Sequence, residues 1–266
     1  MSLYLQQSGC TDKPAIVLLH GWGMHSDVWL SWLPMLENYY SVIRLDLPGL
    51  GRSADHFPAS YSLNSVSAMV HERILAEVEH PVIWLGWSLG GLVAAQIVAD
   101  NPTCARGLVT IATTPCFVQR PDFKEAMDSQ VFQQFQQGLE RSWLKTLNRF
   151  LMLMVQGGAQ SRQTIKVLKQ LLGLYQTIEP RCLSEALALL NQDYRGLYRR
   201  VSVPRLQLFA DSDGLVPNEV ARRPEVAEYA SIIANSSHVP FLAQPQSCIE
   251  KIVQFENSLK LQSEAI

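Results

Sequence analysis

The sequence predicts an α/β protein with a mostly parallel, doubly wound sheet and an inserted helical subdomain. Short apolar runs with strand character alternate with helical periodicity over residues 1–114 and again over 201–266, which is the pattern of βαβ units. Over residues 115–200 strand patterns are absent and helical periodicity takes over. We therefore expect a core formed by residues 1–114 and 201–266, with residues 115–200 inserted as a helical lid.

Length and composition are those of a globular domain. The chain has 266 residues and a net charge of −2, which gives no indication of nucleic-acid binding. The first ten residues carry neither a basic region nor an apolar run, and no apolar stretch has the length of a membrane span. The five cysteines are scattered without a C-x-x-C pair, so neither a zinc site nor a disulfide framework is indicated. We expect a cytoplasmic, monomeric protein with no nucleic-acid or membrane partner.

The strands are expected wherever short, mainly apolar runs with strand character occur. They cover Leu3–Gln7 at the edge of the sheet, then Ala15–Leu19, Tyr40–Leu45, Pro81–Leu85, Gly107–Ala112, Leu206–Ala210 and Ala230–Ala234. Apolar residues at helical spacing predict helices over Val28–Leu36, Leu63–Val78 and Leu92–Ala99. Ser62 or Asn64 is suited to cap the second of these helices.

The segment Asp46–Ser53 reads D-L-P-G-L-G-R-S and is expected to form a turn. Asp46 and Ser53 carry groups that occur in catalytic sites. Because Pro and Gly dominate the segment, turn formation explains it better than catalysis does.

The stretch Gly86–Gly90 reads G-W-S-L-G and lies where a strand pattern changes into a helix pattern. A serine on such a sharp turn is exposed at the C-terminal edge of the sheet, and the flanking glycines allow a backbone conformation that a Cβ would obstruct. Ser88 is therefore the expected nucleophile. The alternative, an ordinary glycine-rich turn, is not excluded by this motif alone.

A second glycine loop, His20–Gly23, follows a buried strand and reads H-G-W-G. Such a loop turns a main-chain N–H toward the negative charge that develops during acyl transfer. We expect the oxyanion to lie between the N–H groups of Trp22 and Leu89, the latter at a helix N-terminus. The other interpretation of this loop is a simple strand-to-helix turn.

An acid and a base follow the last two strands. Asp211 and Asp213 come after the penultimate strand and His238 after the last, which gives the chain order Ser, Asp, His. His238 is expected to act as general base and Asp213 to orient it. Asp211 is the rival orienter, but Asp213 is preferred because it lies at the turn into the next helix, whereas Asp211 lies closer to the strand end. The attack would form an acyl-Ser88 enzyme that water then hydrolyses, and neither a metal nor an organic cofactor is implied.

The helical segment is unusually basic. Residues 116–200 contain twelve Lys and Arg against seven Asp and Glu, a local charge of +5 that leaves −7 for the rest of the chain. No acidic residue lies between positions 141 and 170, where the basic side chains form an i, i+4 row and a second set on the polar side of the next helix: Arg141, Lys145 and Arg149, then Arg162, Lys166 and Lys169. Surface helices usually mix signs, so an acidic or phosphate-bearing partner is indicated, although a solvated helix face is the simpler alternative. The apolar run Phe150–Met154 exceeds what one helix face buries and is expected to line a substrate channel.

The motifs H-G-W-G, D-L-P-G-x-G-R-S, W-L-G-W-S-L-G-G-L-V-A, R-F-L, D-G-L-V-P and S-H-x-P-F together resemble, along nearly the whole chain, the pimeloyl-acyl-carrier-protein methyl ester esterases of biotin synthesis. The α/β-hydrolase motifs are shared by many esterases, whereas Trp22, Trp87 and the lid sequence Arg149-Phe150-Leu151 are more specific. The resemblance implies the α/β-hydrolase fold and a carboxylesterase that removes the methyl group from the distal carboxylate of a pimeloyl chain on acyl carrier protein. Its implied residues are the triad Ser88, Asp213 and His238, the oxyanion donors Trp22 and Leu89, and a substrate site of Trp22, Trp87, Ser88, Leu89, Phe150, Leu151, Met152, Leu153, Met154 and His238.

Acyl carrier protein is acidic and presents its cargo on a phosphopantetheine, which fits the basic rows of the lid. The side chains expected to dock it are Arg141, Lys145, Arg149, Arg162 and Lys166. Three alternatives stay open: a general short-chain carboxylesterase, a carbon–carbon bond hydrolase, and an inactive hydrolase-fold binding module. Dehalogenase and epoxide hydrolase chemistry is disfavoured, since those relatives carry Asp at the position of Ser88.

Overall fold

The computed structural model describes residues 2–174 and 179–264 of the chain. In this part of the chain, the strands form one seven-stranded sheet in the order β1-β3-β2-β4-β5-β6-β7. The strands are β1 (Leu5–Ser8), β2 (Ala15–Leu19), β3 (Ser41–Leu45), β4 (Val82–Trp87), β5 (Ala105–Ile111), β6 (Arg205–Ala210) and β7 (Ala230–Ile233). Only β1 pairs in the antiparallel sense. The predicted mostly parallel α/β sheet is therefore confirmed.

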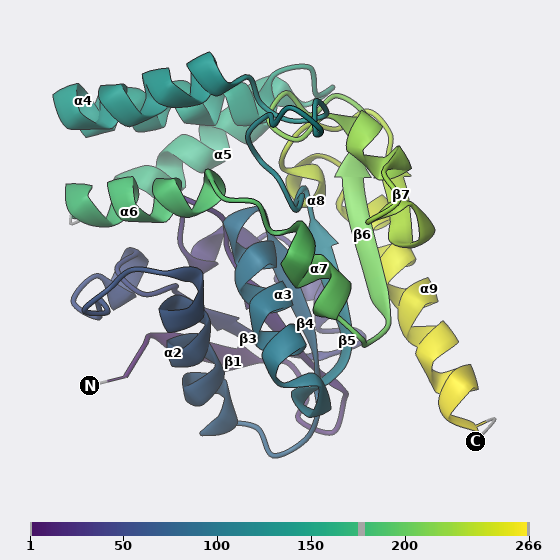
Figure 1. Cartoon of the computed structure of the whole chain (residues 1–266). Coiled ribbons are helices and arrows are strands. Elements are labelled where there is room, and N and C mark those ends of the chain that lie inside the picture. The colour runs from purple at the N-terminus through teal and green to yellow at the C-terminus, as the bar shows by residue number, and fades with distance from the viewer. Residues whose placement is uncertain (1, 175–178, 265–266) are drawn as a thin grey trace.

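Helices cover both faces of the sheet (Figure 1). The α-helices are α1 (Leu33–Leu36), α2 (Leu63–Leu75), α3 (Leu89–Asp100), α4 (Ser129–Val155), α5 (Ser161–Leu174), α6 (Pro180–Leu190), α7 (Arg195–Arg200), α8 (Pro240–Ala243) and α9 (Pro245–Glu264). Helices α2, α3 and α7 contact one another on the face turned toward the viewer, and α9 packs against β5, β6 and β7. Among the described residues, no helix is both long and apolar enough to cross a membrane.

The order of the strands fixes where a site can form. The chain passes from β2 to β3 on one side and then to β4 on the other side of β2. Connections on opposite sides of the sheet leave a crevice outside the carboxyl ends of β2 and β4, and ligands of open α/β sheets bind at such switch points. The loops that begin at His20 and Ser88 leave the sheet at this crevice.

Between β5 and β6 the chain is mainly helical. Helices α4, α5 and α6 lie across the carboxyl ends of the strands, over the switch point (Figure 1). We call residues 115–200, which include this group and the undescribed residues 175–178, the helical insertion. Helix α4 is kinked at Ser142, whose φ of −162° and ψ of 90° are extended, and the freed Ser142 carbonyl accepts a hydrogen bond from Thr146 Oγ1 at 3.0 Å.

One predicted helix is wrong in extent. Instead of a helix over Val28–Leu36, the structure has a 3₁₀ turn at Ser26–Trp29 and a separate short α1 that begins at Leu33. Pro34 explains the break, because its ring would collide with the Leu30 carbonyl in a continuous helix but is tolerated in the first turn of a new one. The capping prediction for α2 is resolved in favour of Ser62, which forms a capping box with Ser65.

Candidate active site

Ser88 lies on a strained turn between β4 and α3. Its φ of 54° and ψ of −117° are rare for a residue with a side chain, and such strain is typical of functional positions. The turn depends on its glycines: a Cβ at Gly86 would lie 2.2 Å from the Gly90 carbonyl oxygen, and one at Gly90 would lie 2.3 Å from the Leu19 carbonyl oxygen. The turn thereby carries Ser88 to the floor of a cavity beneath the helical insertion.

His238 and Asp213 form a buried hydrogen-bonded pair. The His238 Nδ1–H donates to Asp213 Oδ2 at 2.8 Å, while Asp213 Oδ1 accepts from the N–H groups of Leu215 and Val216 at 2.8 and 3.0 Å. Since Nδ1 carries the proton, the lone pair of a neutral His238 lies on Nε2. That atom has no hydrogen-bond partner in the described part of the chain, and His238 lines the same cavity as Ser88. The pair can therefore accept a proton at the cavity wall.

The rival carboxylate, Asp211, has a different position. Its two oxygens accept hydrogen bonds from the N–H groups of Asn235 and Ser236 at 2.8 and 3.1 Å. These residues belong to the loop that carries His238. Asp211 therefore fixes the path of the loop, and the carboxylate that contacts the imidazole is Asp213.

Trp22 and Leu89 lie on the two loops that flank the switch point. Among the described residues, neither main-chain N–H donates to a carbonyl in a turn or loop, and neither residue belongs to the lining of the cavity that contains Ser88. The indole of Trp22 donates from Nε1 to the Leu183 carbonyl of α6 at 2.9 Å, and its ring meets Phe150 of α4 edge to face, with centroids 4.7 Å apart. Trp22 thus connects the loop after β2 with the helical insertion.

Trp87 is fully buried behind the site. Its Nε1–H donates to the His238 carbonyl at 2.8 Å, and its ring covers Gly21 so closely that a Cβ there would lie 3.0 Å away. Trp87 is absent from the lining of the cavity. The structure therefore places it as a support of the His238 loop rather than on the cavity wall expected for a substrate-binding residue.

The cavity above Ser88 is apolar. Its lining comes from the core and from α4 and α6: Ser88, Phe117, Met127, Phe132, Phe135, Phe150, Leu187, Leu190, Leu215 and His238. Because only His238 in this lining is ionisable, the cavity suits an uncharged substrate segment. In the described part of the chain, no three His, Cys, Asp or Glu side chains are grouped so that they could hold a metal ion.

The run Phe150–Met154 divides between different faces of α4. Phe150 lines the cavity, whereas Leu151 and Met154 are buried against neighbouring elements, Leu153 is partly buried, and Met152 is 50 % exposed. Successive residues of a helix point about 100° apart, so five consecutive side chains cannot share one wall. Within this run the expected channel lining is thus restricted to Phe150. Sequence reasoning missed Phe132 and Phe135 on the first half of α4, although their spacing to Leu139 is that of a single helix face.

Each long helix of the insertion accepts a hydrogen bond from a residue beside the site. The Met154 carbonyl of α4 accepts from the His238 N–H at 3.0 Å, and the Leu171 carbonyl of α5 accepts from His25 Nε2 at 3.1 Å. The Leu183 carbonyl of α6 accepts from Trp22, as described above. Met154 and Leu171 lie in the last turns of their helices, where carbonyl groups lack intrahelical partners.

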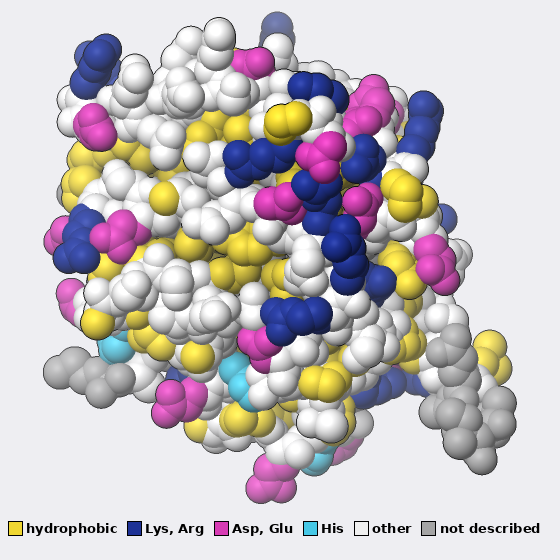
Figure 2. Space-filling model, viewed as in Figure 1, with side chains coloured by type: hydrophobic (Ala, Val, Ile, Leu, Met, Phe, Trp, Pro, Cys, Tyr) yellow, Lys and Arg dark blue, Asp and Glu magenta, His cyan; other side chains and the backbone are white. Residues whose placement is uncertain are grey.

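The five basic side chains expected to dock a carrier protein are all exposed on the insertion: Arg141, Lys145, Arg149, Arg162 and Lys166. In residues 2–174 and 179–264 none of them has an acidic partner within 4.0 Å. By contrast Arg195 pairs with Asp122 and Asp193, and Figure 2 shows basic and acidic side chains interspersed over the right half of one face.

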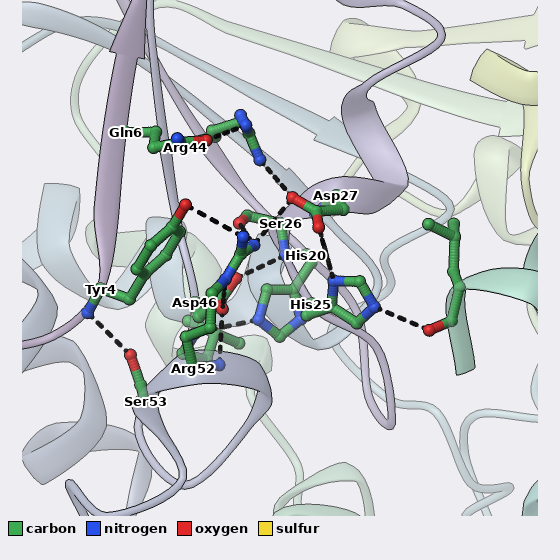
Figure 3. A network of polar contacts seen from close by, with 12 residues as sticks. Tyr4, Gln6, His20, His25, Ser26, Asp27, Arg44, Asp46, Arg52 and Ser53 are labelled. Atoms are coloured by element: carbon green, nitrogen blue, oxygen red, sulfur yellow. Dashed lines mark hydrogen bonds and ion pairs between the residues drawn. The ribbon is translucent and has the colours of Figure 1, made fainter. Parts of the chain in front are cut away.

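A buried polar network lies beneath the loop that carries Trp22 (Figure 3). Asp46 is completely buried and accepts hydrogen bonds from the Ser26 N–H at 2.7 Å, the Arg52 N–H at 2.8 Å and Arg52 Nε at 3.0 Å. Ser53 Oγ accepts from the Tyr4 N–H at 2.9 Å. Asp46 and Ser53 thus hold loops together, as the turn interpretation predicts.

His20 belongs to the same network. It is fully buried, and both ring nitrogens lie 2.9 Å from a main-chain partner: Nδ1 from the Gly21 carbonyl and Nε2 from the Leu47 N–H. Burial lowers the pKa of His20 to about 4. The ring is therefore neutral in the folded protein at neutral pH.

The buried neutral state of His20 leads to a prediction about acid stability. The unfolded chain binds this proton near pH 6.5 and the folded chain near pH 4, so protonation favours unfolding in the interval between them. We expect His20 alone to lower the free energy of unfolding by about 2 kcal/mol at pH 5 relative to pH 8. The free energy of unfolding in urea is measured for the wild type and for His20→Asn at pH 5 and pH 8. The loss on going from pH 8 to pH 5 should be larger in the wild type by this amount. Equal losses in the two proteins would contradict it.

The chain is similar to known proteins in sequence. The Alpha/beta hydrolase family matches residues 16–251. The chain is 33 % identical over 249 residues to a pimeloyl-[acyl-carrier protein] methyl ester esterase of Yersinia pseudotuberculosis, covering 92 % of this chain and 94 % of the relative. It is 34 % identical over 258 residues to a protein of the same name from Pectobacterium atrosepticum, covering 96 % and 98 % of the two chains.

Solved structures share the fold. A bromoperoxidase from Bacillus anthracis superposes with a TM-score of 0.85 at 20 % identity, over 96 % of this chain and 95 % of the other. An esterase from Exiguobacterium antarcticum gives 0.82 at 19 % identity, over 95 % and 94 %.

Proposed function

Since the chain belongs to the alpha/beta hydrolase family, we propose that it is a serine carboxylesterase that hydrolyses the methyl ester of a pimeloyl chain carried on acyl carrier protein. The products are pimeloyl-acyl carrier protein and methanol, as the relatives' name and the sequence resemblance to the esterases of biotin synthesis imply. The observation that supports a hydrolase most directly is the buried Asp213–His238 pair. Its His238 Nε2 lies on the wall of a cavity shared with Ser88 and has no hydrogen-bond partner among the described residues.

In the first half of the reaction, Ser88 Oγ attacks the ester carbonyl carbon while His238 Nε2 takes the hydroxyl proton. The carbonyl oxygen becomes an oxyanion, which the N–H groups of Trp22 and Leu89 stabilise. Asp213 holds the imidazolium that forms. When the tetrahedral intermediate collapses, the proton on Nε2 passes to the departing methoxide, and methanol leaves an acyl-Ser88 enzyme.

In the second half, water takes the place of methanol. His238 Nε2 removes a proton from the water, whose oxygen attacks the acyl carbon, and the proton then passes to Ser88 Oγ as the ester bond breaks. The product carries a carboxylate at the end of the chain. An apolar cavity favours the neutral ester over this charged group, so the lining promotes product release.

We infer that the helical insertion is a lid and that its basic side chains dock the acidic carrier protein. Exposed Arg and Lys that have no acidic partner in the described part of the chain can contact carboxylates and the phosphate of phosphopantetheine. Leu144 and Met152, each 50 % exposed on α4, lie along the same helix as Arg141, Lys145 and Arg149. They would add apolar contact to the charged surface.

The assay that tests the proposal compares pimeloyl-acyl-carrier-protein methyl ester with p-nitrophenyl butyrate, at low and moderate salt, with Ser88→Ala as the blank. We expect a higher kcat/KM on the carrier-bound ester and a preference that declines as salt screens the docking charges. Equal or better use of the small ester at every salt concentration would instead identify a generalist esterase. Hydrolysis of neither ester by folded protein would reject the enzyme function.

A charge-reversal prediction follows for the docking surface. Arg149→Glu and Arg162→Glu are each expected to lower kcat/KM on the carrier-bound ester by about 10-fold or more, because opposed charges slow the encounter of the two proteins. Turnover of p-nitrophenyl butyrate should change little. Lys251→Glu, the same charge change at an exposed position of α9, is the matched control and should leave both activities in place. Equal losses on both esters would point to a disturbed lid rather than to lost docking.

A further inference from the structure

His20 holds the carbonyl of the peptide that precedes Trp22. Its Nδ1 lies 2.9 Å from the Gly21 carbonyl oxygen, and its Nε2 lies 2.9 Å from the Leu47 N–H, with the ring fully buried between these groups (Figure 3). The turn bond from the Met24 N–H reaches the same carbonyl oxygen at a longer distance of 3.3 Å. The imidazole is therefore the nearer of the two donors to this carbonyl.

The two partners determine the tautomer of the ring. A main-chain N–H can only donate, so Nε2 must present its lone pair to Leu47. A carbonyl oxygen can only accept, so Nδ1 must carry the proton that is donated to Gly21. The neutral Nδ1–H tautomer satisfies both bonds, whereas the opposite tautomer breaks both.

The Gly21 carbonyl belongs to the same peptide unit as the Trp22 N–H. The described chain contains no cis peptide bond, and in a planar trans peptide the C=O and the N–H point in opposite directions. Fixing the oxygen on one side of the plane therefore fixes the direction of the N–H on the other. Rotation of this plane would change the direction of the N–H.

We propose that His20 is a positioning residue for the oxyanion hole: its Nδ1–H anchors the Gly21 carbonyl and thereby aims the Trp22 N–H at the oxygen of the reacting carbonyl. This role rests on the proposed serine-esterase function, in which that oxygen becomes negatively charged. His20 itself contacts neither Ser88 nor the cavity.

The Nε2 side of the His20 ring is also anchored. Leu47, which donates to Nε2, follows Asp46, and the Asp46 carboxylate bonds to Ser26 and Arg52. His20 is thus held between the loop that carries the oxyanion donor and the loop after β3. Two anchored partners restrict the ring rotation that would otherwise let the peptide plane turn.

Two substitutions separate the two hydrogen bonds. In His20→Asn the side-chain amide reaches the position of Nδ1 and can still donate to Gly21, but nothing replaces Nε2. In His20→Gln the longer amide reaches the position of Nε2 and can accept from Leu47, but the donor to Gly21 is lost. Both variants bury one neutral amide in place of the imidazole, so they are matched in polarity.

The measurement is kcat and KM on p-nitrophenyl butyrate, which requires Ser88 but no carrier protein. His20→Gln is expected to lower kcat by about 10–100-fold, less than the loss of a whole oxyanion donor, with KM within about twofold, because the defect affects the transition state. His20→Asn should retain kcat within about threefold. Affinity for a boronic acid that forms a tetrahedral adduct should fall in parallel with kcat. Equal activities of the two variants, or a larger loss in His20→Asn, would overturn the proposal.

A measurement on the wild type covers the case in which His20→Gln fails to fold. In protein labelled with ¹⁵N-histidine, the His20 ring is expected to show a protonated Nδ1 and an unprotonated Nε2 at pH 7. A protonated Nε2 would exclude the bond to Leu47 and overturn the proposal. If the wild type hydrolyses no ester while His20 shows the expected tautomer, the esterase function fails and the hydrogen-bond geometry stands.

Discussion

Replacement of Ser88 by alanine is expected to lower kcat for ester hydrolysis by about 10⁶-fold while leaving the fold intact. Ser88 Oγ is the atom that would form the acyl intermediate, and no neighbouring group can replace it. The positive φ of Ser88 is imposed by the turn and is tolerated no better by alanine, so the stability of the variant should resemble that of the wild type. Steady-state hydrolysis of p-nitrophenyl butyrate and thermal unfolding measure the two quantities.

Ser237 provides a matched control for this substitution. It is buried beside His238, and Ser237→Ala removes a hydroxyl from the same region without altering the turn that carries Ser88. A fluorophosphonate reagent should label the wild type and Ser237→Ala but not Ser88→Ala. If Ser88→Ala kept more than about one per cent of the wild-type kcat, the covalent mechanism would be wrong.

The second large effect is expected at Asp213. In Asp213→Asn the amide can no longer accept the Nδ1–H of His238 with a charged oxygen, and donation from its NH₂ group would favour the wrong tautomer of the imidazole. We expect kcat to fall by about 10⁴-fold with little change in KM. Raising the pH should not restore the activity, because the tautomer rather than the titration of the ring is altered.

Asp211→Asn tests whether catalysis depends on orientation of the His238 imidazole or on support of the loop that carries it. Asp211 carries the same carboxylate two residues away and accepts hydrogen bonds from main-chain N–H groups of the His238 loop. Its substitution should lower stability by about 1 kcal/mol and kcat by less than about 10-fold. A loss at Asp211 as large as that at Asp213 would show that the loop, and not the imidazole contact, limits catalysis.

The centre of the sheet was predictable because its strands are buried on both faces and are therefore continuously apolar, as Ala15–Leu19 shows. The failure at Val28–Leu36 has a local cause: the apolar spacing there is helical, but Pro34 interrupts the helix. Spacing shows which faces are apolar, whereas a single proline determines whether one helix or two form.

The candidate triad was predictable for a topological reason. Ser88, Asp213 and His238 each follow a parallel strand, and the carboxyl ends of parallel strands lie at one edge. The function of His20 could not be predicted in this way, because one of its two main-chain partners, Leu47, lies 27 residues further along the chain. Convergence of that kind depends on three-dimensional packing, which no pattern along the chain encodes. The place of Phe132 and Phe135 on the cavity wall depends on packing as well. Their spacing puts them on one face of α4, but that this face is turned to the cavity follows only from the position of α4 over it.

The hydrogen bonds that join α4, α5 and α6 to His238, His25 and Trp22 have a thermodynamic consequence. Displacement of these helices would remove support from the general base and from the oxyanion loop together. Free energy gained when an acyl chain binds beneath the helices is then available to order the catalytic groups, and a substrate without the chain contributes less to that ordering. The preference for substrates that carry the acyl chain and the carrier protein would accordingly appear in kcat as well as in KM. Hydrogen exchange at the N–H of His238 should slow when a long-chain ligand binds, although that N–H does not contact the ligand.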